Sequence, residues 1–275
     1  MKAPRLPSWL TRLVELLGRP LKLLKHPRAL PLLAGLYLLI LTAMLVRFFL
    51  TEPIVALDTD LWYHLTGGSQ ILAHRVIPHD SFFSFLTPAR EWVDYYWLFQ
   101  VVVASVHAAF GNYGLVILRG CLSAGILIMV MAFLARNFRE RRDVLTLVVL
   151  SSIYMAVLLG RLMNLRPHLF TYLLLVIMLW VLEWAPRRAL WLVPLTMVWV
   201  NLHGIVYPLI LTVIGAYAAE HAVRAWQQRR ISREAWTCWA ALALSALAVL
   251  CTPHGTKLLG CRFAPPPTPP TMSTS

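Results

Sequence analysis

The sequence predicts an all-α fold in which a bundle of helices crosses a membrane several times. Hydrophobic residues make up 59% of the 275 residues and charged residues only 13%, whereas soluble domains are just under half apolar and about a quarter charged. The apolar residues gather in runs that approach the roughly 20 residues needed to cross a bilayer as a helix. The chain is therefore expected to form one polytopic integral membrane domain over residues 29–260.

Eight apolar runs are the candidate membrane segments. Some of them are short for a crossing at about 1.5 Å of rise per residue, so seven or eight segments are expected rather than a fixed number. The runs cover residues 30–50, 95–110, 114–135, 144–160, 169–184, 189–201, 205–223 and 237–251.

The first 28 residues predict a basic amphipathic helix on the cytoplasmic face of the membrane. Seven lysines and arginines stand against a single acid, Glu15, and leucines recur at helical spacing from Leu10 to Leu21. Such a helix lies on an anionic membrane surface with its apolar side in the lipid. The following apolar run has no small-residue cleavage pattern at its end, so it is expected to remain as the first membrane segment rather than to act as a signal peptide.

The distribution of charge predicts the orientation of the chain. Residues 51–94 hold six acids against two arginines, so this loop, with short helices of its own, is expected on the outer face. The basic clusters at 136–142, 186–188 and 224–233 are expected in the cytoplasm. The segments 160–168, 201–204 and 252–255 alternate with them and are expected outside. This alternation requires the run 95–110 to enter the membrane only partly.

The net charge of +13 is explained by these flanking clusters. No aromatic-interleaved basic motif accompanies it, so no nucleic-acid partner is expected. Residues 261–275 are rich in proline, serine and threonine and are expected to be a disordered tail, because they lack the apolar residues that build a core.

The segment "LDTDLWYHL" is the first candidate functional site. Asp58 or Thr59 can cap a helix that starts near Asp60, and His64 then falls on the same face as Asp60. Capping and a salt bridge would account for these residues without any chemistry. Alternatively, the carboxylate of Asp60 or Asp58 can act as a general base, or the two together can hold a divalent cation such as Mg²⁺ or Mn²⁺.

Arginines supply candidate phosphate ligands. Arg166 and His168 lie in "RLMNLRPHLF", and Arg119 lies five residues into an apolar run. The planar guanidinium binds two phosphate oxygens and stays charged, although an arginine near a membrane face also reaches lipid headgroups without further function. An arginine inside the membrane indicates a functional site.

Asn201 and His203 in "WVNLHG" form a third candidate constellation. A polar pair that satisfies a helix end is the alternative explanation for them. The later segment "TPHG" is mostly turn chemistry. No spacing typical of a zinc site connects the histidines, so zinc is not expected.

Several segments together resemble a known family. The residues "DTDLWYHLTGGSQILAHRVIPHDSFFSF", "NLRPHLFTYLLL", "WVNLHG" and "TPHG" resemble a group of bacterial polytopic membrane proteins with a loop of the form D-x-D-x-W-W-H-L. That group is similar to the GT-C superfamily of membrane glycosyltransferases, which includes protein O-mannosyltransferases and lipid A aminoarabinose transferases. The resemblance runs from about residue 30 to residue 255.

The resemblance implies a GT-C-like amino-terminal module in the bacterial inner membrane with a cytoplasmic amino terminus. It implies a polyprenyl-phosphate-linked sugar as donor and a base at Asp58 or Asp60. Arg119 and Arg166 would be candidates for the donor phosphate. From the chemistry of their own segments, His64, His168, Asn201 and His203 are expected as further substrate-binding residues. Two departures are Tyr63 where the group has tryptophan, and "TPHG" in place of a sequence like "NPYG".

Two alternatives to an enzyme stay open. The chain could bind a lipid-linked glycan as a transport or scaffold protein, although no internal repeat of the kind found in transporters is visible. Because family members continue with further spans beyond the region matched here, a truncated, inactive pseudo-enzyme is the other alternative.

Overall fold

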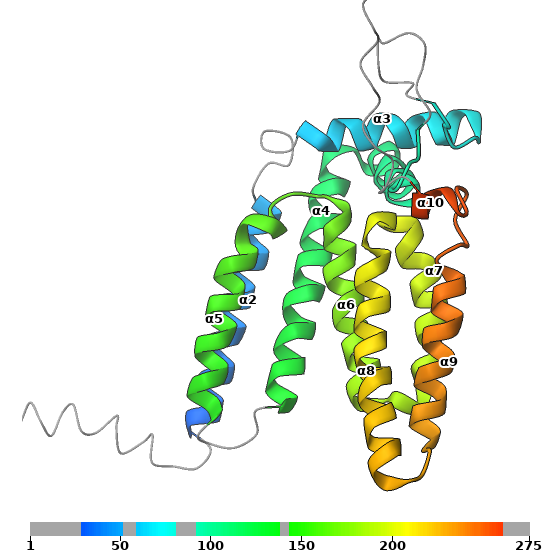
Figure 1. Ribbon diagram of the computed structural model, residues 1–275. Coiled ribbons are helices and arrows are strands. Elements are labelled where there is room, and N and C mark those ends of the chain that lie inside the picture. Colours follow the sequence, from blue (N-terminus) through cyan, green and yellow to red (C-terminus); the bar gives the residue numbers. More distant parts are fainter. Residues whose placement is uncertain (1–28, 52–58, 81–91, 138–142, 261–275) are drawn as a thin grey trace, which may run out of the picture. The chain divides into compact units, whose positions relative to one another are not determined.

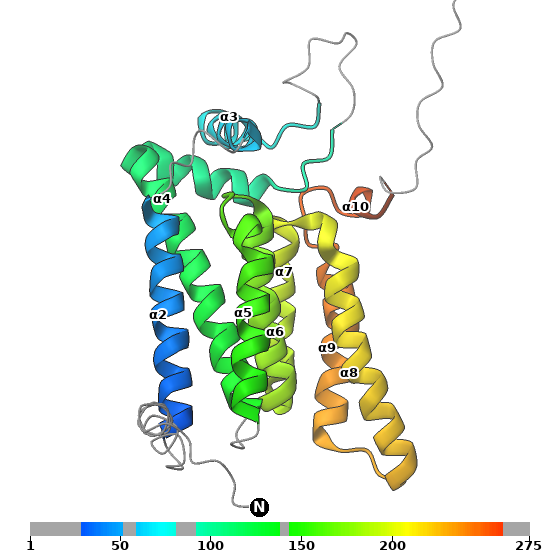
Figure 2. The same cartoon turned by 90° about the vertical axis from the view of Figure 1, so that its left-hand side faces the viewer.

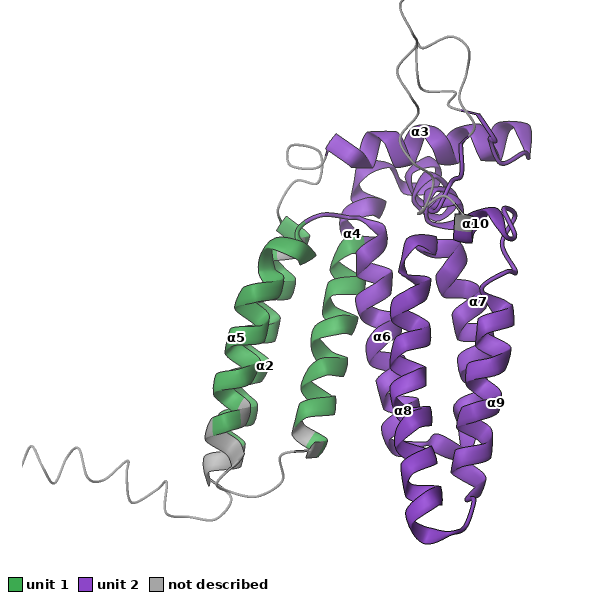
Figure 3. Cartoon of the chain, viewed as in Figure 1, with its two compact units in different colours: residues 1–52, 119–163 green, residues 53–118, 164–275 purple. Residues whose placement is uncertain are grey.

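The computed structural model describes residues 29–51, 59–80, 92–137 and 143–260. These residues form helices and connecting turns, and no β-strand occurs among them, which confirms the all-α fold class. The basic segment 1–28, the residue Asp58 and the tail 261–275 lie outside the described residues. The chain divides into two compact units, residues 1–52 with 119–163 and residues 53–118 with 164–275 (Figure 3).

Unit 1 contains helices α2 (Ala29–Thr51), α5 (Asp143–Leu162) and the carboxyl-terminal part of α4 (Trp97–Asn137). α2 and α5 pack against each other, and the Tyr37 hydroxyl lies 2.9 Å from the Ser152 hydroxyl between them. A Cβ atom on Gly120 would lie 2.4 Å from the Leu50 side chain. A small residue is therefore needed where α4 approaches the end of α2, as is usual between packed helices in membranes.

α4 is broken at Gly111. This residue has φ 61° and ψ −153°, a conformation that only glycine adopts without strain. The part before the break is about 21 Å long at 1.5 Å per residue, too short to cross a hydrocarbon core of about 30 Å. Figure 2 shows it lying crosswise to the long helices of unit 2. The break supports the expectation that the run 95–110 is not a complete crossing.

Unit 2 consists of the first part of α4, a helix above it and a bundle of further helices (Figure 1). The helix above is α3 (Thr59–His74), and a one-turn helix, α10 (Lys257–Gly260), lies near the same end. The bundle contains α6 (Pro167–Trp184), η1 (Pro186–Trp191), α7 (Leu192–Leu202), η2 (Gly204–Val206), α8 (Tyr207–Gln228) and α9 (Arg233–Ala248).

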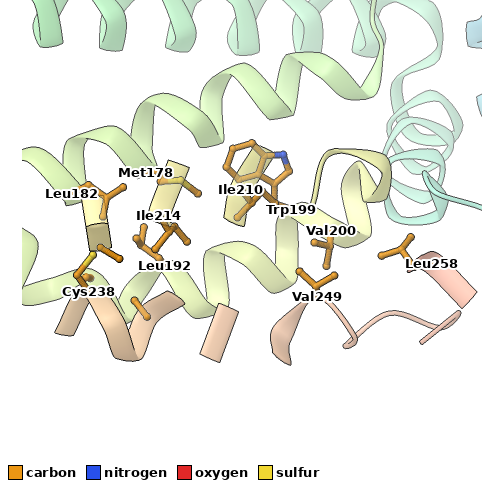
Figure 4. Packing of buried hydrophobic residues seen from close by; sticks show 13 residues of the cluster. Met178, Leu182, Leu192, Trp199, Val200, Ile210, Ile214, Cys238, Val249 and Leu258 are labelled. Atoms are coloured by element: carbon orange, nitrogen blue, oxygen red, sulfur yellow. The ribbon is translucent and has the colours of Figure 1, made fainter. Parts of the chain in front are cut away.

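The core of unit 2 lies between α6, α7, α8 and α9 (Figure 4). Trp199 of α7 is fully buried and is surrounded by Met178, Ile210 and Ile214. Small residues such as Ala241 are also buried there and allow the helices to approach closely. In lipid such a core is stabilised by close packing rather than by removal of apolar surface from water.

Three helical stretches are long and apolar enough to cross a membrane among the residues that the structure describes: Trp97–Leu134, Pro167–Trp184 and Gly204–Gln228. Shorter apolar stretches of α2 (Leu32–Phe48) and α5 (Val148–Leu162) accompany them. The chain thus has the character of a membrane protein, but its described residues contain fewer candidate crossings than the seven or eight that we predicted.

Helix lengths account for part of the difference in number. The runs at 95–110 and 114–135 join into the single broken helix α4, so two predicted segments become one candidate. The run at 189–201 divides into the 3-10 helix η1 and the 11-residue α7, and α9 has only 16 residues, about 24 Å. Apolar composition alone cannot distinguish such short helices from complete crossings.

Candidate functional site

A polar cleft lies at one end of unit 2, where α3 and the beginning of α4 cover the ends of the bundle helices. Its volume is about 240 Å³. Five predicted site residues come together in it: Asp60, His64, Arg166, His168 and His203. The remaining lining residues are Tyr63, Tyr96 and Pro167, and none of these three was predicted as a site residue.

Asp60 and Arg166 form the ion pair of the cleft, with Arg166 Nη1 2.9 Å from Asp60 Oδ2. Asp60 lies in the first turn of α3, and Arg166 immediately precedes α6. Pro167 favours an extended backbone at Arg166, which has φ −127° and ψ 164°. The side chains are 33% and 54% exposed for Arg166 and Asp60, so water and a ligand can reach the pair.

Two consecutive glycines hold α3 close to α4. A Cβ atom on Gly67 would lie 2.2 Å from Gln100 Oε1, and one on Gly68 would lie 2.0 Å from the Gln100 carbonyl oxygen. Leu61 and Leu65 of α3 are buried on this side. The close contact fixes the helix on which Asp60 and His64 lie one turn apart, as their spacing predicted.

His64 is buried at the base of the cleft and is held by aromatic rings. Its side chain is 5% exposed and contacts Tyr96 and Phe99 edge-to-face, at ring centroid distances of 5.5 Å and 4.9 Å. Burial lowers the pKa of His64 to about 4, against the opposing effect of Asp60, so the ring is neutral at pH 7. Its Nδ1 atom is buried and has no hydrogen-bond partner among the described residues.

A chain of hydrogen bonds holds the His203 ring in place. The Trp199 indole donates to Thr171 Oγ1 at 3.1 Å, and Thr171 Oγ1 lies 2.7 Å from His203 Nδ1. The threonine oxygen therefore connects the buried indole to the imidazole. Burial, with His168 and His64 nearby, lowers the pKa of His203 to about 4, so the ring is neutral at pH 7.

Asp94 is a buried acid behind the cleft that the sequence analysis did not select. Its Oδ1 accepts from the Tyr96 backbone N–H at 2.9 Å and from Gln100 Nε2 at 3.1 Å, and its own N–H donates to His254 Nε2 at 3.2 Å. Burial raises the pKa of Asp94 to about 6. The segment "TPHG" therefore contributes more than a turn, since His254 connects it to the residues that lead into α4.

Two of the predicted substrate-binding residues, Asn201 and Arg119, lie outside the cleft. The Asn201 amide accepts from Trp97 Nε1 at 2.8 Å and donates to the carbonyls of Met197 and Cys251 at 2.7 Å and 3.0 Å. Its polar atoms thus join three segments of unit 2, and it does not line the cleft. Arg119 belongs to unit 1, where it is 1% exposed and Nη1 donates to the Met163 carbonyl at 2.9 Å.

The cleft offers few ligands for the divalent cation considered above. Asp60 is the only acid among its described lining residues, and it is paired with Arg166. Among the described residues no three histidines, cysteines or acids are close enough to hold a metal ion. Asp58, the other expected ligand, lies outside them.

No family model, no curated protein and no solved structure matches the chain. The chemistry of the cleft must therefore be argued from its residues.

Proposed function

We propose that this protein is a membrane glycosyltransferase that transfers a sugar from a polyprenyl-phosphate donor to a hydroxyl acceptor. The observation that carries the proposal is the Asp60–Arg166 pair, a base and a phosphate ligand 2.9 Å apart at the edge of a polar cleft. A guanidinium binds a phosphate through two parallel hydrogen bonds. A donor phosphate on Arg166 would compete with the carboxylate of Asp60 and release it to act as a base.

In this reaction Asp60 takes the proton of the acceptor hydroxyl as its oxygen attacks the anomeric carbon. The bond between that carbon and the phosphate oxygen breaks, and the polyprenyl phosphate leaves with both bonding electrons. Arg166 stabilises the charge that develops on the leaving phosphate, which is the kind of contribution that accounts for much of enzymatic rate enhancement.

The neutral histidines suit the uncharged part of the substrate. His64 and His203 both line the cleft, and burial keeps their rings neutral. A neutral imidazole has one donor and one acceptor nitrogen and can orient sugar or acceptor hydroxyls. Tyr63 and Tyr96 add aromatic surface to the wall of the cleft.

The distribution of charge in unit 2 supports an outer-face site. The cleft lies at one end of the bundle, and the arginine-rich turn between α8 and α9 lies at the other (Figures 1 and 2). Because arginines collect on the cytoplasmic side, the cleft would face outward in the inner membrane of a bacterium, and the amino terminus would be cytoplasmic.

The test is a transfer assay with the full chain reconstituted in lipid. Polyprenyl-phosphate hexose and pentose, each labelled in the sugar, are supplied separately, and released polyprenyl phosphate and donor binding are measured. We expect turnover with one of them and its loss by a factor of 100 or more in Asp60→Asn, with donor binding retained. Binding without release by the wild type would instead favour the transport or scaffold alternative or an inactive enzyme, and full activity in Asp60→Asn would disprove the assigned base.

A further inference from the structure

A second pocket lies at the turn between α8 and α9, at the end of unit 2 opposite the cleft. Its volume is about 220 Å³, several times the roughly 30 Å³ that a water molecule occupies in the liquid. It plays no part in the proposed transfer reaction. Its lining residues are Pro186, His221, Arg224, Ala225, Gln228, Arg230, Ser232 and Glu234.

This end of the bundle is strongly basic. The segments 183–188 and 220–234 contain six arginines and three glutamates. The arginines are Arg187, Arg188, Arg224, Arg229, Arg230 and Arg233, and the glutamates are Glu183, Glu220 and Glu234. The excess of positive charge around a pocket predicts an anionic ligand.

Ion pairs orient part of this charge and leave part of it available. Arg224 pairs with Glu220 one turn earlier on α8, which holds its guanidinium at the pocket. Arg187 Nε donates to Glu234 Oε1 at 2.6 Å, and this hydrogen bond lowers the pKa of Glu234 to about 2, so the acid of the pocket already has a cationic partner. The guanidinium of Arg230 has no ion-pair partner among the described residues.

Large apolar side chains surround the same turn. Trp226 is 80% exposed, Trp236 is 61% exposed, and Ile231 between them is 49% exposed. Tryptophans are enriched where a membrane protein meets the headgroup region, because the ring is apolar and the indole N–H is polar. Exposed tryptophans beside a basic pocket place that pocket at the level of lipid headgroups.

We infer that the pocket between α8 and α9 binds the phosphate of an anionic phospholipid through Arg224 and Arg230, with Trp226 and Trp236 in the adjoining interface. Arginine suits this ligand because its planar guanidinium makes paired hydrogen bonds to phosphate oxygens. Arginines that merely set the orientation of the chain would need no pocket. The inference is independent of the chemistry of the cleft.

The test uses the purified full chain in a neutral detergent. Short-chain phosphatidylglycerol, short-chain phosphatidylcholine and inorganic phosphate are titrated separately, and the rise in Tm gives an apparent Kd for each. Two variants probe the pocket: the double variant Arg224→Gln with Arg230→Gln removes its charge, and Ala225→Leu fills it while keeping the charge. Arg75→Gln is the matched control, since this exposed arginine follows α3 at the other end of unit 2.

We expect phosphatidylglycerol to bind the wild type and Arg75→Gln equally, and at least tenfold more weakly to the double variant and to Ala225→Leu. Phosphatidylcholine should bind at least tenfold more weakly than phosphatidylglycerol. Equal phosphatidylglycerol affinity in the wild type and both pocket variants would overturn the inference. Inorganic phosphate that binds as tightly as phosphatidylglycerol would show that the pocket does not select a lipid. A similar loss of phosphatidylglycerol affinity in Arg75→Gln would show that the effect depends on net charge alone.

Discussion

The Arg166 guanidinium and the Asp60 carboxylate lie 2.9 Å apart, although one residue precedes α6 and the other begins α3. Both side chains are substantially exposed, and exposed ion pairs contribute about 0–1 kcal/mol to folding. The pair therefore contributes little to the stability of the fold, and ligand binding is the better explanation for its presence.

The first prediction concerns the contribution of the Asp60–Arg166 ion pair to the free energy of unfolding. In a double-mutant cycle with Asp60→Ala and Arg166→Ala, the coupling to the free energy of unfolding should be below about 1 kcal/mol, because solvent screens the pair. Chemical denaturation in detergent measures it. A coupling of several kcal/mol would show that the pair is mainly structural.

The second prediction concerns the contact between α3 and α4. Gly68→Ala should destabilise the protein by about 1–3 kcal/mol, because its Cβ would lie 2.0 Å from a backbone oxygen that cannot easily move. Gly67→Ala should also destabilise it, since its Cβ would lie 2.2 Å from Oε1 of Gln100, whose side chain is buried and hydrogen-bonded to Asp94.

Gly215→Ala in α8 is the matched control, because nothing lies within 4 Å of its added Cβ and alanine favours a helix by about 0.5–1 kcal/mol. The three variants are compared by their unfolding free energies. Equal costs for Gly68→Ala and Gly215→Ala would contradict the proposed close contact.

The third prediction concerns pH and Asp94. Its folded pKa of about 6 lies above the ordinary value of 3.8, so its contribution to stability is complete below about pH 4 and is lost as the pH rises through 6. Asp94→Asn removes this loss. Relative to the wild type, the variant should therefore gain up to about 3 kcal/mol between pH 4 and pH 7.5.

The unfolding free energies of both proteins at the two pH values measure this difference. The pH-dependent contributions of His64 and His203 to stability cancel in the comparison, because both proteins contain these histidines. A pH-independent difference for Asp94→Asn would mean that the carboxyl group is not buried as described.

The fourth prediction concerns the hydrogen bonds of Thr171. Thr171→Val keeps the shape of the side chain but leaves the Trp199 indole and His203 Nδ1 without their partner. Because Trp199 is fully buried, the loss should cost about 1–3 kcal/mol. Thr171→Ser, which keeps the hydroxyl, should retain the histidine signals of the wild type in an NMR spectrum, and unchanged signals in Thr171→Val would contradict the hydrogen bond between Thr171 and His203.

The fifth prediction concerns orientation. In a variant without the four natural cysteines, Asp80→Cys and Arg233→Cys should be labelled by an impermeant thiol reagent from opposite sides of the membrane. The reason is that α8, with 22 residues, is about 33 Å long and separates the two ends of unit 2. Labelling of both positions from the same side would contradict the proposed topology.

The sequence predicted which segments are helical and which residues are chemically notable, because apolar runs and local spacing are visible in one dimension. The same reasoning predicted more crossings than the described residues show as candidates, since it could not see that the run 189–201 folds into η1 and the short helix α7. It also missed Asp94 and Thr171. An aspartate and a threonine are common residues, and only their burial beside His254 and His203 makes them important.

The sequence by itself determined the helical fold class, the membrane character and the helix on which Asp60 and His64 lie one turn apart. These properties depend on composition and on contacts between neighbours along the chain. The tertiary structure decided which distant residues meet. It brought Arg166, His168 and His203 together with Asp60 in the cleft. The Asn201 amide instead forms hydrogen bonds that connect segments of unit 2, and Arg119 belongs to unit 1. Those pairings depend on packing between helices, such as the contact of Gly67 and Gly68 with Gln100, which no local pattern specifies.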